Sequence, residues 1–131
     1  MQGQQPMCQR LSLRSERPQI DPEQMARLQR RLGAPTAEEV LCRALEEIAV
    51  RLSRAEREHR TAQRAKLAGS VRAIAGQAGQ IGLPALARVA DDVGYCLGAG
   101  DETALAATMA RLVRVGEGSL MAIWDLDDLS L

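Results

Sequence analysis

The sequence has almost no aromatic residues, a single histidine and no excess of either charge. Its 131 residues include one Trp, one Tyr and no Phe, and 17 basic residues are balanced by 17 acidic ones. Without aromatic side chains there is no platform on which bases could stack, and a neutral chain lacks the electrostatic footprint of a nucleic-acid binder. These absences argue against a nucleic-acid partner.

Cysteine is also scarce, since Cys8, Cys42 and Cys96 stand far apart and form no CxxC motif. With only one histidine, they cannot complete a zinc site at any usual spacing. We therefore expect no metal and interpret the cysteines as reduced thiols of a cytoplasmic protein. The sequence also has no apolar run of membrane-spanning length and no signal-peptide core, so no membrane partner is expected.

Alanine, leucine, arginine and glutamate are the abundant residues, and this composition favours helices. Apolar residues recur at intervals of three and four in several segments, and no segment predicts a strand. A chain of this length fits one domain. The sequence therefore predicts an all-α fold, an up-and-down four-helix bundle with an additional short N-terminal helix. We expect it to span residues 21–131, after a flexible arm at residues 1–20.

Capping residues indicate where the helices begin. Asp21 before a proline predicts the start of the short first helix. Thr36, with Glu39 three residues later, predicts a capping box at the start of the most regular helix. Asp101 predicts the start of the last long helix, whose middle we expect Gly116 and Gly118 to weaken.

The stretch 36–68 contains no glycine or proline, so one continuous helix would fit it. Its apolar stripe nevertheless jumps five residues between Ala62 and Leu67, which favours a bend or a short loop. The charged part of this stretch, residues 51–66, is typical of a solvated face. Dimerisation through a protruding helix is the alternative.

The chain is organised around residues 67–93, LAGSVRAIAGQAGQIGLPALARVADDV. In the first half of this stretch, apolar residues spaced by four and three predict one buried stripe along a helix. The opposite, outward face would carry Gly69, Arg72, Gly76 and Gly79. Because an exposed helical glycine costs about 1 kcal/mol relative to alanine, this face needs an explanation. One is a docking face kept bare for a partner. The others are close packing against another helix or a dimer mate, and fraying.

No arrangement of residues in the sequence indicates catalysis. His59 lies in a charged segment, and no phosphate-binding loop, nucleophile elbow or dinucleotide fingerprint is present. Asp91 and Asp92 are adjacent, so on a helix they would point about 100° apart. We therefore expect no enzymatic activity, no catalytic residue and no cofactor.

The central stretch resembles the histidine-phosphotransfer (HPt) domains of bacterial phosphorelays. That family's signature is a histidine followed by x-Leu-Lys-Gly-Ser, four residues and a glycine, and then a Leu-Ala-rich helix. Here Arg72 takes the histidine position, Ile74 the leucine, Ala75 the lysine and Gly76 the glycine. Gln77 takes the serine position. The residues that follow match the closing glycine, the next helix and the Gly-Asp before the final helix: Ile81, Gly82, Leu86, Ala87, Ala90, Val93, Gly100 and Asp101.

The departures from this signature indicate a degenerate member. An arginine stays protonated and cannot accept a phosphoryl group, and Ala75 lacks the charge of the lysine it replaces. A second register places Leu67, Gly69 and Ser70 on the motif, but it loses the downstream match. Neither register puts His59 at the phosphorylated position.

The resemblance implies a non-catalytic signalling protein that binds a receiver domain of a response regulator, or a histidine kinase. The expected partner-binding residues are Gly69, Arg72, Ala75, Gly76, Gly79 and Gln80. Two alternatives remain open at this point. His59 could act as a displaced phosphoacceptor, or the chain could be a structural homodimer with no role in a phosphorelay.

Overall fold

The computed structural model describes residues 20–129, and the side chains of residues 20–123. Within these ranges the fold is all-helical, as the sequence predicts, and contains no strand. The helices are α2 (Pro22–Leu32), α3 (Ala34–Arg60), α4 (Arg64–Gln80), α5 (Pro84–Ala99) and α6 (Glu102–Leu129). Apart from Ile20, which packs against the core, the arm expected at residues 1–20 lies outside the described residues.

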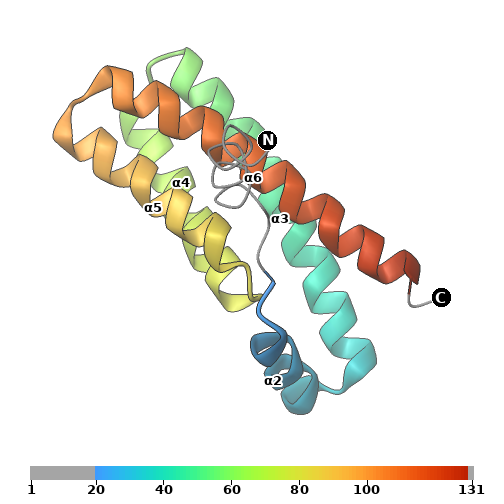
Figure 1. Ribbon diagram of the computed structural model, residues 1–131. Helices are drawn as coiled ribbons and strands as arrows, with labels where there is room; N and C mark the ends of the chain where they lie inside the picture. The colour runs from blue at the N-terminus through green and yellow to red at the C-terminus, as the bar shows by residue number, and fades with distance from the viewer. Residues whose placement is uncertain (1–19, 130–131) are drawn as a thin grey trace, which may run out of the picture.

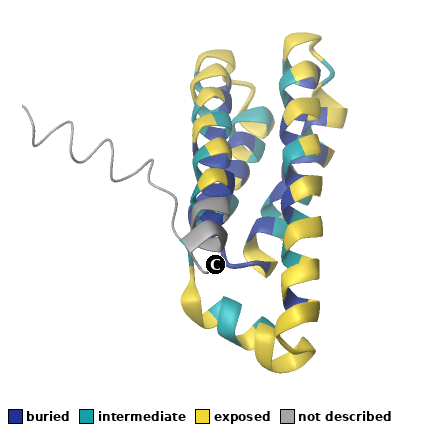
Figure 2. Ribbon diagram, turned by 90° about the vertical axis from the view of Figure 1, so that its right-hand side faces the viewer, coloured by how far each residue is buried: buried dark blue, intermediate teal, exposed yellow. Residues whose placement is uncertain are grey.

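Helices α3 to α6 follow one another through short turns, and each packs against the next along the chain (Figure 1). α3 also contacts α6, so the first and last of these helices meet. Buried residues line the inward sides of the helices and exposed residues the outward sides (Figure 2). The core is built from aliphatic side chains, as the lack of aromatics requires. Its largest fully buried hydrophobic members are Leu45, Ile48, Leu67, Ile74, Leu83, Leu86, Leu105, Leu112, Val93 and Val115.

Two of the three predicted helix starts are confirmed. The Asp21 carboxylate accepts hydrogen bonds from the backbone N–H groups of Glu23 and Gln24, at 3.0 and 3.4 Å. Asp101 Oδ1 accepts one from the N–H of Ala104 at 3.0 Å. Each aspartate therefore satisfies N–H groups that have no partner within the helix.

The predicted capping box at Thr36 and Glu39 is wrong, because α3 already begins at Ala34. Gly33, with a φ of +82°, ends α2 and precedes α3 without a side-chain cap. Pro35 lies in the first turn of α3, where its missing N–H removes no helical hydrogen bond. Thr36 is therefore inside the helix.

The stretch 36–68 is not one continuous helix. α3 ends at Arg60, and α4 begins at Arg64 after a turn in which Ala62 has a φ of +56°. In this turn Thr61 Oγ1 donates to the Arg57 carbonyl at 2.8 Å, and the Gln63 N–H donates to the Glu58 carbonyl at 2.8 Å. The short loop indicated by the jump in the apolar stripe is therefore confirmed, and no part of α3 protrudes as an uninterrupted helix to residue 68.

α2 lies beside the turn between α4 and α5 (Figure 1). The Asp21 N–H donates to the Gly82 carbonyl at 2.8 Å, and Gln24 Nε2 donates to the Gln80 carbonyl at 3.1 Å. Gly82 has a φ of +83°, and a Cβ there would lie 3.1 Å from the Asp21 carbonyl oxygen. This turn therefore needs a glycine both for its conformation and for the approach of the chain that enters α2.

Candidate functional site

The candidate site is the outward side of α4, and the core fixes which side that is. Leu67, Val71, Ile74 and Ala78 are all buried, with exposed fractions of 2% or less, as the sequence predicts. Because this stripe anchors the rotation of α4, the residues half a turn away must face outward. We call the exposed residues Gly69, Arg72, Gly76 and Gly79 the glycine face.

The three glycines of this face have open space around them. A Cβ built on Gly69, Gly76 or Gly79 would meet no heavy atom within 4 Å. Close packing against another helix of the same chain, one of the explanations considered from the sequence, therefore does not account for them. α4 also runs through all three glycines to Gln80 without a break.

Arg72 is the one long side chain of the glycine face, and it is exposed at mid-helix. Its guanidinium forms no hydrogen bond or ion pair with any residue that the structure describes. Its five N–H donors are therefore left to solvent or to a binding partner.

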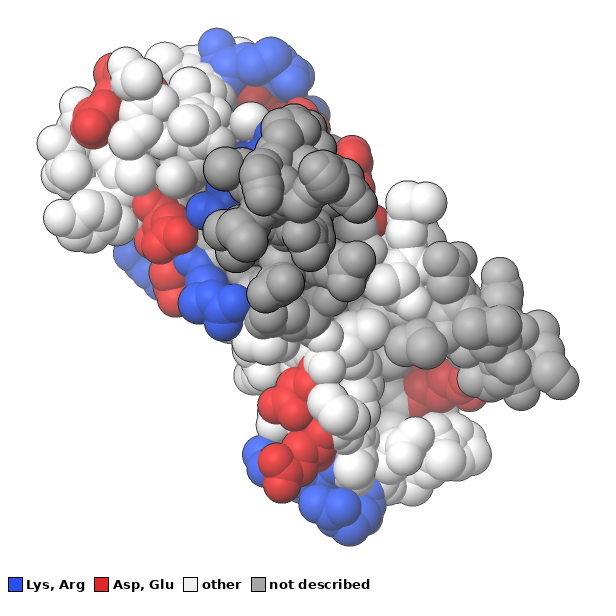
Figure 3. All heavy atoms as spheres, viewed as in Figure 1, with Lys and Arg blue, Asp and Glu red and all other residues white. Residues whose placement is uncertain are grey.

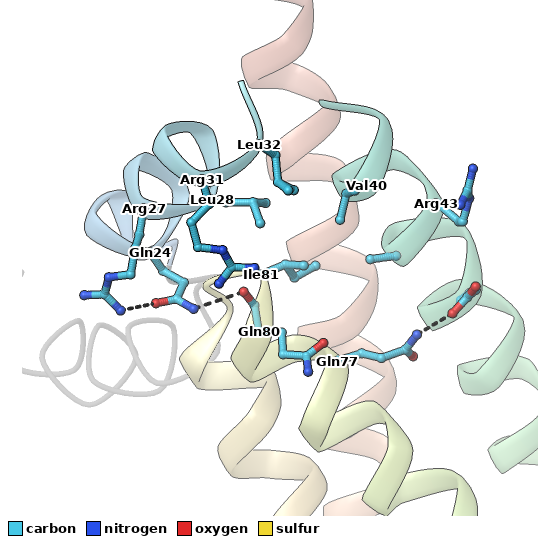
Figure 4. A pocket seen from close by; sticks show the side chains of 12 residues that line it. Gln24, Arg27, Leu28, Arg31, Leu32, Val40, Arg43, Gln77, Gln80 and Ile81 are labelled. Carbon is cyan, nitrogen blue, oxygen red and sulfur yellow. Dashed lines mark hydrogen bonds between the residues drawn. The ribbon is translucent and has the colours of Figure 1, made fainter. Parts of the chain in front are cut away.

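The other two predicted contact residues lie at the edges of this face. Ala75 is half-buried and packs against the core, so it contributes to the flank of the surface. Gln80 is exposed at the end of α4, where its backbone carbonyl accepts a hydrogen bond from the side chain of Gln24 on α2 (Figure 4). α2 therefore bounds the glycine face at this end.

A cavity of about 380 Å³ lies beside this boundary, between α2, α3 and α4 (Figure 4). Hydrogen bonds hold two parts of its wall, since Arg27 Nη1 donates to Gln24 Oε1 at 2.9 Å and Gln77 Nε2 donates to Glu47 Oε1. These bonds join α2 to itself and α3 to α4, while Arg31 and Arg43 line the same cavity without a hydrogen-bond partner among the described residues.

The residues considered for chemistry lie apart from the glycine face. His59 is half-buried in the last turn of α3. Asp91 and Asp92 are exposed on α5. Cys42 and Cys96 are free thiols. Among the described residues, no three His, Cys, Asp or Glu side chains are grouped so that they could hold a metal ion.

The sequence did not indicate a second polar site, between the C-terminal half of α3 and the start of α4. Here Arg51, Arg54 and Arg57 of α3 and Lys66 of α4 line a cavity of about 510 Å³, which we call the basic cleft. Lys and Arg side chains gather at the end of the molecule that carries the α3–α4 turn (Figure 3). Most of the charge run 51–66 is exposed, as expected of a solvated face, and the turn also brings its two ends together across one cavity.

A buried hydrogen bond forms part of the wall of the basic cleft. Glu58 is only 6% exposed, and its Oε1 accepts a hydrogen bond from Ser70 Oγ at 2.7 Å. A buried carboxylate is costly without such a partner, so this bond ties α3 to α4 at the cleft. Ser70, which the second register of the resemblance assigned to the motif, points inward.

The sequence matches no protein-family model, and searches of curated proteins and of solved structures find no match either. The likeness to HPt domains therefore rests on the residues of the central stretch. None of the helices in the described part of the chain is both long enough and apolar enough to cross a membrane.

Proposed function

We propose that this protein is a degenerate, HPt-like signalling protein that binds a receiver domain or a histidine kinase without carrying phosphate itself. The observation that carries the proposal is the glycine face. It is a helical surface with open space at three glycines and one unpaired arginine at its centre. In the resemblance, Arg72 occupies the position of the phosphoaccepting histidine.

The order of the helices supports this proposal. α3, α4, α5 and α6 each pack against the next, and α3 meets α6, which fits an up-and-down four-helix bundle with α2 as the additional short helix. In such a bundle α4 carries the arginine on its solvent side. The bundle would hold the glycine face rigidly, as a docking surface requires.

Arg72 suits an acidic partner. A guanidinium is always charged and binds a carboxylate or a phosphoryl group through two parallel hydrogen bonds. Docked on a receiver domain, Arg72 would lie opposite the acidic pocket or pair with the phosphorylated aspartate. The bare backbone at Gly69 and Gly76 would let the partner approach α4 closely.

The same residues argue against phosphotransfer by this surface. Arginine is protonated at neutral pH, so it has no free electron pair with which to attack a phosphoryl group. Ala75, at the position of the family's lysine, is uncharged and packs against the core. The proposed role is therefore binding and regulation.

The first test is a binding assay against the receiver domains and histidine-kinase domains of the source organism, with and without a phosphate mimic. We expect one of them to bind, and Arg72→Glu to abolish the binding because it reverses the charge at the centre of the face. Arg30→Glu, a matched change on the exposed side of α2, should leave the binding intact. Absence of binding to every domain would end this proposal.

A second test uses the open space at Gly76. Gly76→Gln puts a long side chain on the glycine face without a clash inside the chain, so the fold should persist while partner binding is lost. Gly98→Gln is the matched control, because Gly98 is also an exposed helical glycine with open space, but on α5. Equal effects of the two variants on binding would contradict docking at the glycine face.

The two alternatives make different predictions. A phosphoacceptor role for His59 predicts that a phosphorylated receiver transfers radiolabel to this chain and that His59→Gln prevents the transfer. A structural homodimer predicts a stable dimer in sedimentation at micromolar concentration, and a monomer at that concentration would contradict it.

A further inference from the structure

We propose that the basic cleft is a binding site for a small polyphosphate, such as inorganic triphosphate or the phosphate chain of a nucleotide. The site adjoins the glycine face, with which it shares Gly69, but its four cations lie outside that face, so it does not depend on receiver or kinase binding. It lies on the side of α3 and α4 where the turn at residues 61–63 joins them.

The cleft concentrates positive charge from two helices. Arg51, Arg54 and Arg57 follow at intervals of three along α3 and so share one side of it. Lys66 faces them from the first turn of α4, and all four line the same cavity. Like charges this close repel each other, so the arrangement favours an anion between them.

None of these four side chains has an acidic partner. No described residue forms a hydrogen bond or ion pair with the side chain of Arg51, Arg54, Arg57 or Lys66. The acid of the cleft, Glu58, is buried and bonded to Ser70. Glu46 and Glu47 line a neighbouring cavity together with Arg51 and Arg54, but neither forms an ion pair with them.

Arg51 also carries an unsatisfied donor. Its Nε is buried and has no hydrogen-bond partner among the described residues. Buried donors in native proteins are almost always paired, and an unpaired one lowers stability. A phosphate bound in the cleft would pair with the terminal N–H groups of Arg51, which no described residue engages.

The start of α4 adds to the attraction. Gln63, at its N-cap, lines the cleft, and no side chain accepts hydrogen bonds from the first turn. The unpaired N–H groups and the positive end of the helix dipole favour an anion there. This effect supplements the four cations.

The volume of the basic cleft and the residues that line it indicate which class of anion would bind there. A cavity of about 510 Å³ is larger than a single phosphate needs and falls within the range of small-molecule sites. No aromatic residue lines it, so no side chain is available to stack on a base. The phosphates, and not a base, would therefore be recognised, and four cations match a chain of two or three phosphates.

The test is calorimetric titration of the full chain with inorganic triphosphate, with ADP and ATP as separate arms and sodium chloride at matched ionic strength. We expect saturable binding of triphosphate, with little further gain from the adenosine of ATP. Arg51→Gln should weaken it about tenfold or more, since a charge-assisted hydrogen bond is lost. Arg43→Gln, a matched change elsewhere on α3, should leave it unchanged.

Three outcomes of the triphosphate titration would overturn this proposal. They are an absence of saturable binding, an effect that sodium chloride reproduces, and equal losses in Arg51→Gln and Arg43→Gln variants whose circular dichroism shows that both are folded. Tighter binding of a single-stranded oligonucleotide than of triphosphate would also overturn it, in favour of a nucleic-acid surface. Failure of receiver or kinase binding would leave it standing, because the cleft shares only Gly69 with the glycine face and none of its four cations belongs to that face.

Discussion

The helical glycines of this protein occur in two opposite settings. On α4, Gly69, Gly76 and Gly79 face outward into open space. On α6, Gly116 is buried, and a Cβ there would lie 2.5 Å from Leu52 Cδ1 of α3. The first setting keeps a surface bare, whereas the second lets two helices of the chain approach closely. The role of a glycine within a helix therefore depends on which residues surround it in the fold.

The largest effect is expected when the buried glycine is replaced. Gly116→Val forces side-chain atoms into the position of Leu52, which is itself in the core, and overpacking of this kind typically costs 1–3 kcal/mol. We expect the free energy of unfolding in urea to fall by about 2 kcal/mol. An unchanged or raised stability would show that α3 and α6 do not need this close approach.

A double-mutant cycle tests whether Leu52 is the residue that requires a glycine at position 116. Gly116→Ala should destabilise the native protein but stabilise Leu52→Ala, in which the obstructing methyl groups are absent and alanine is the better helix former. The coupling free energy should be about 1–2 kcal/mol, the range for residues in direct contact. Additive effects in chemical denaturation would mean that Leu52 is not the constraint.

The outward glycines should behave in the opposite way. Gly76→Ala and Gly79→Ala add a methyl group to open space and remove the entropic cost of glycine, so each should raise stability by about 0.5–1 kcal/mol. Gly98→Ala on α5 is the control and should give a similar gain. If thermal melts showed that Gly76→Ala lowers stability while Gly98→Ala does not, the added methyl group at Gly76 would be clashing with another molecule, such as a second copy of the chain, because nothing within the chain lies there.

The smallest effect concerns a position that lacks a glycine. Ala62 has a φ of +56°, a conformation that L-residues adopt only with strain. Ala62→Gly relieves this strain but makes the unfolded chain more flexible, so the net gain should be about 0.5 kcal/mol. A loss of stability in urea unfolding would show that the turn depends on the alanine methyl group.

Local patterns predicted much of the fold. The buried stripe of α4 follows directly from the spacing of Leu67, Val71, Ile74 and Ala78, and it determined correctly which residues of that helix face outward. Asp21 and Asp101 cap their helices as expected, because capping depends on residues two or three positions away.

Other features depend on residues far apart in sequence and were not predictable from local patterns. Gly116 was expected only to weaken the middle of α6. Its contact with Leu52, 64 positions earlier, which requires a small residue there, could not be read from the neighbouring sequence. Thr36 was predicted to cap α3, but the helix begins at Ala34, with Gly33 at the N-cap and Pro35 in its first turn. In both cases a neighbour decided the outcome.

The candidate sites differ in the same way. The glycine face lies on one helix, so its periodicity makes it visible in the sequence. The basic cleft needs Lys66 to face Arg51, Arg54 and Arg57 across a turn, and that turn contains no glycine or proline to indicate it. The jump in the apolar stripe was the one local sign of the turn, and it does not reveal which side chains the turn brings together.

The link between Asp21 and Gly82 has a consequence for the order in which the chain assembles. α2 contains no buried residue, and its entry is held by a backbone hydrogen bond to a turn some sixty positions later. That acceptor is in place only after α4 and α5 have come together, so α2 should dock last and detach first. Its amide hydrogens should therefore exchange with solvent while those in the centre of α4 remain protected.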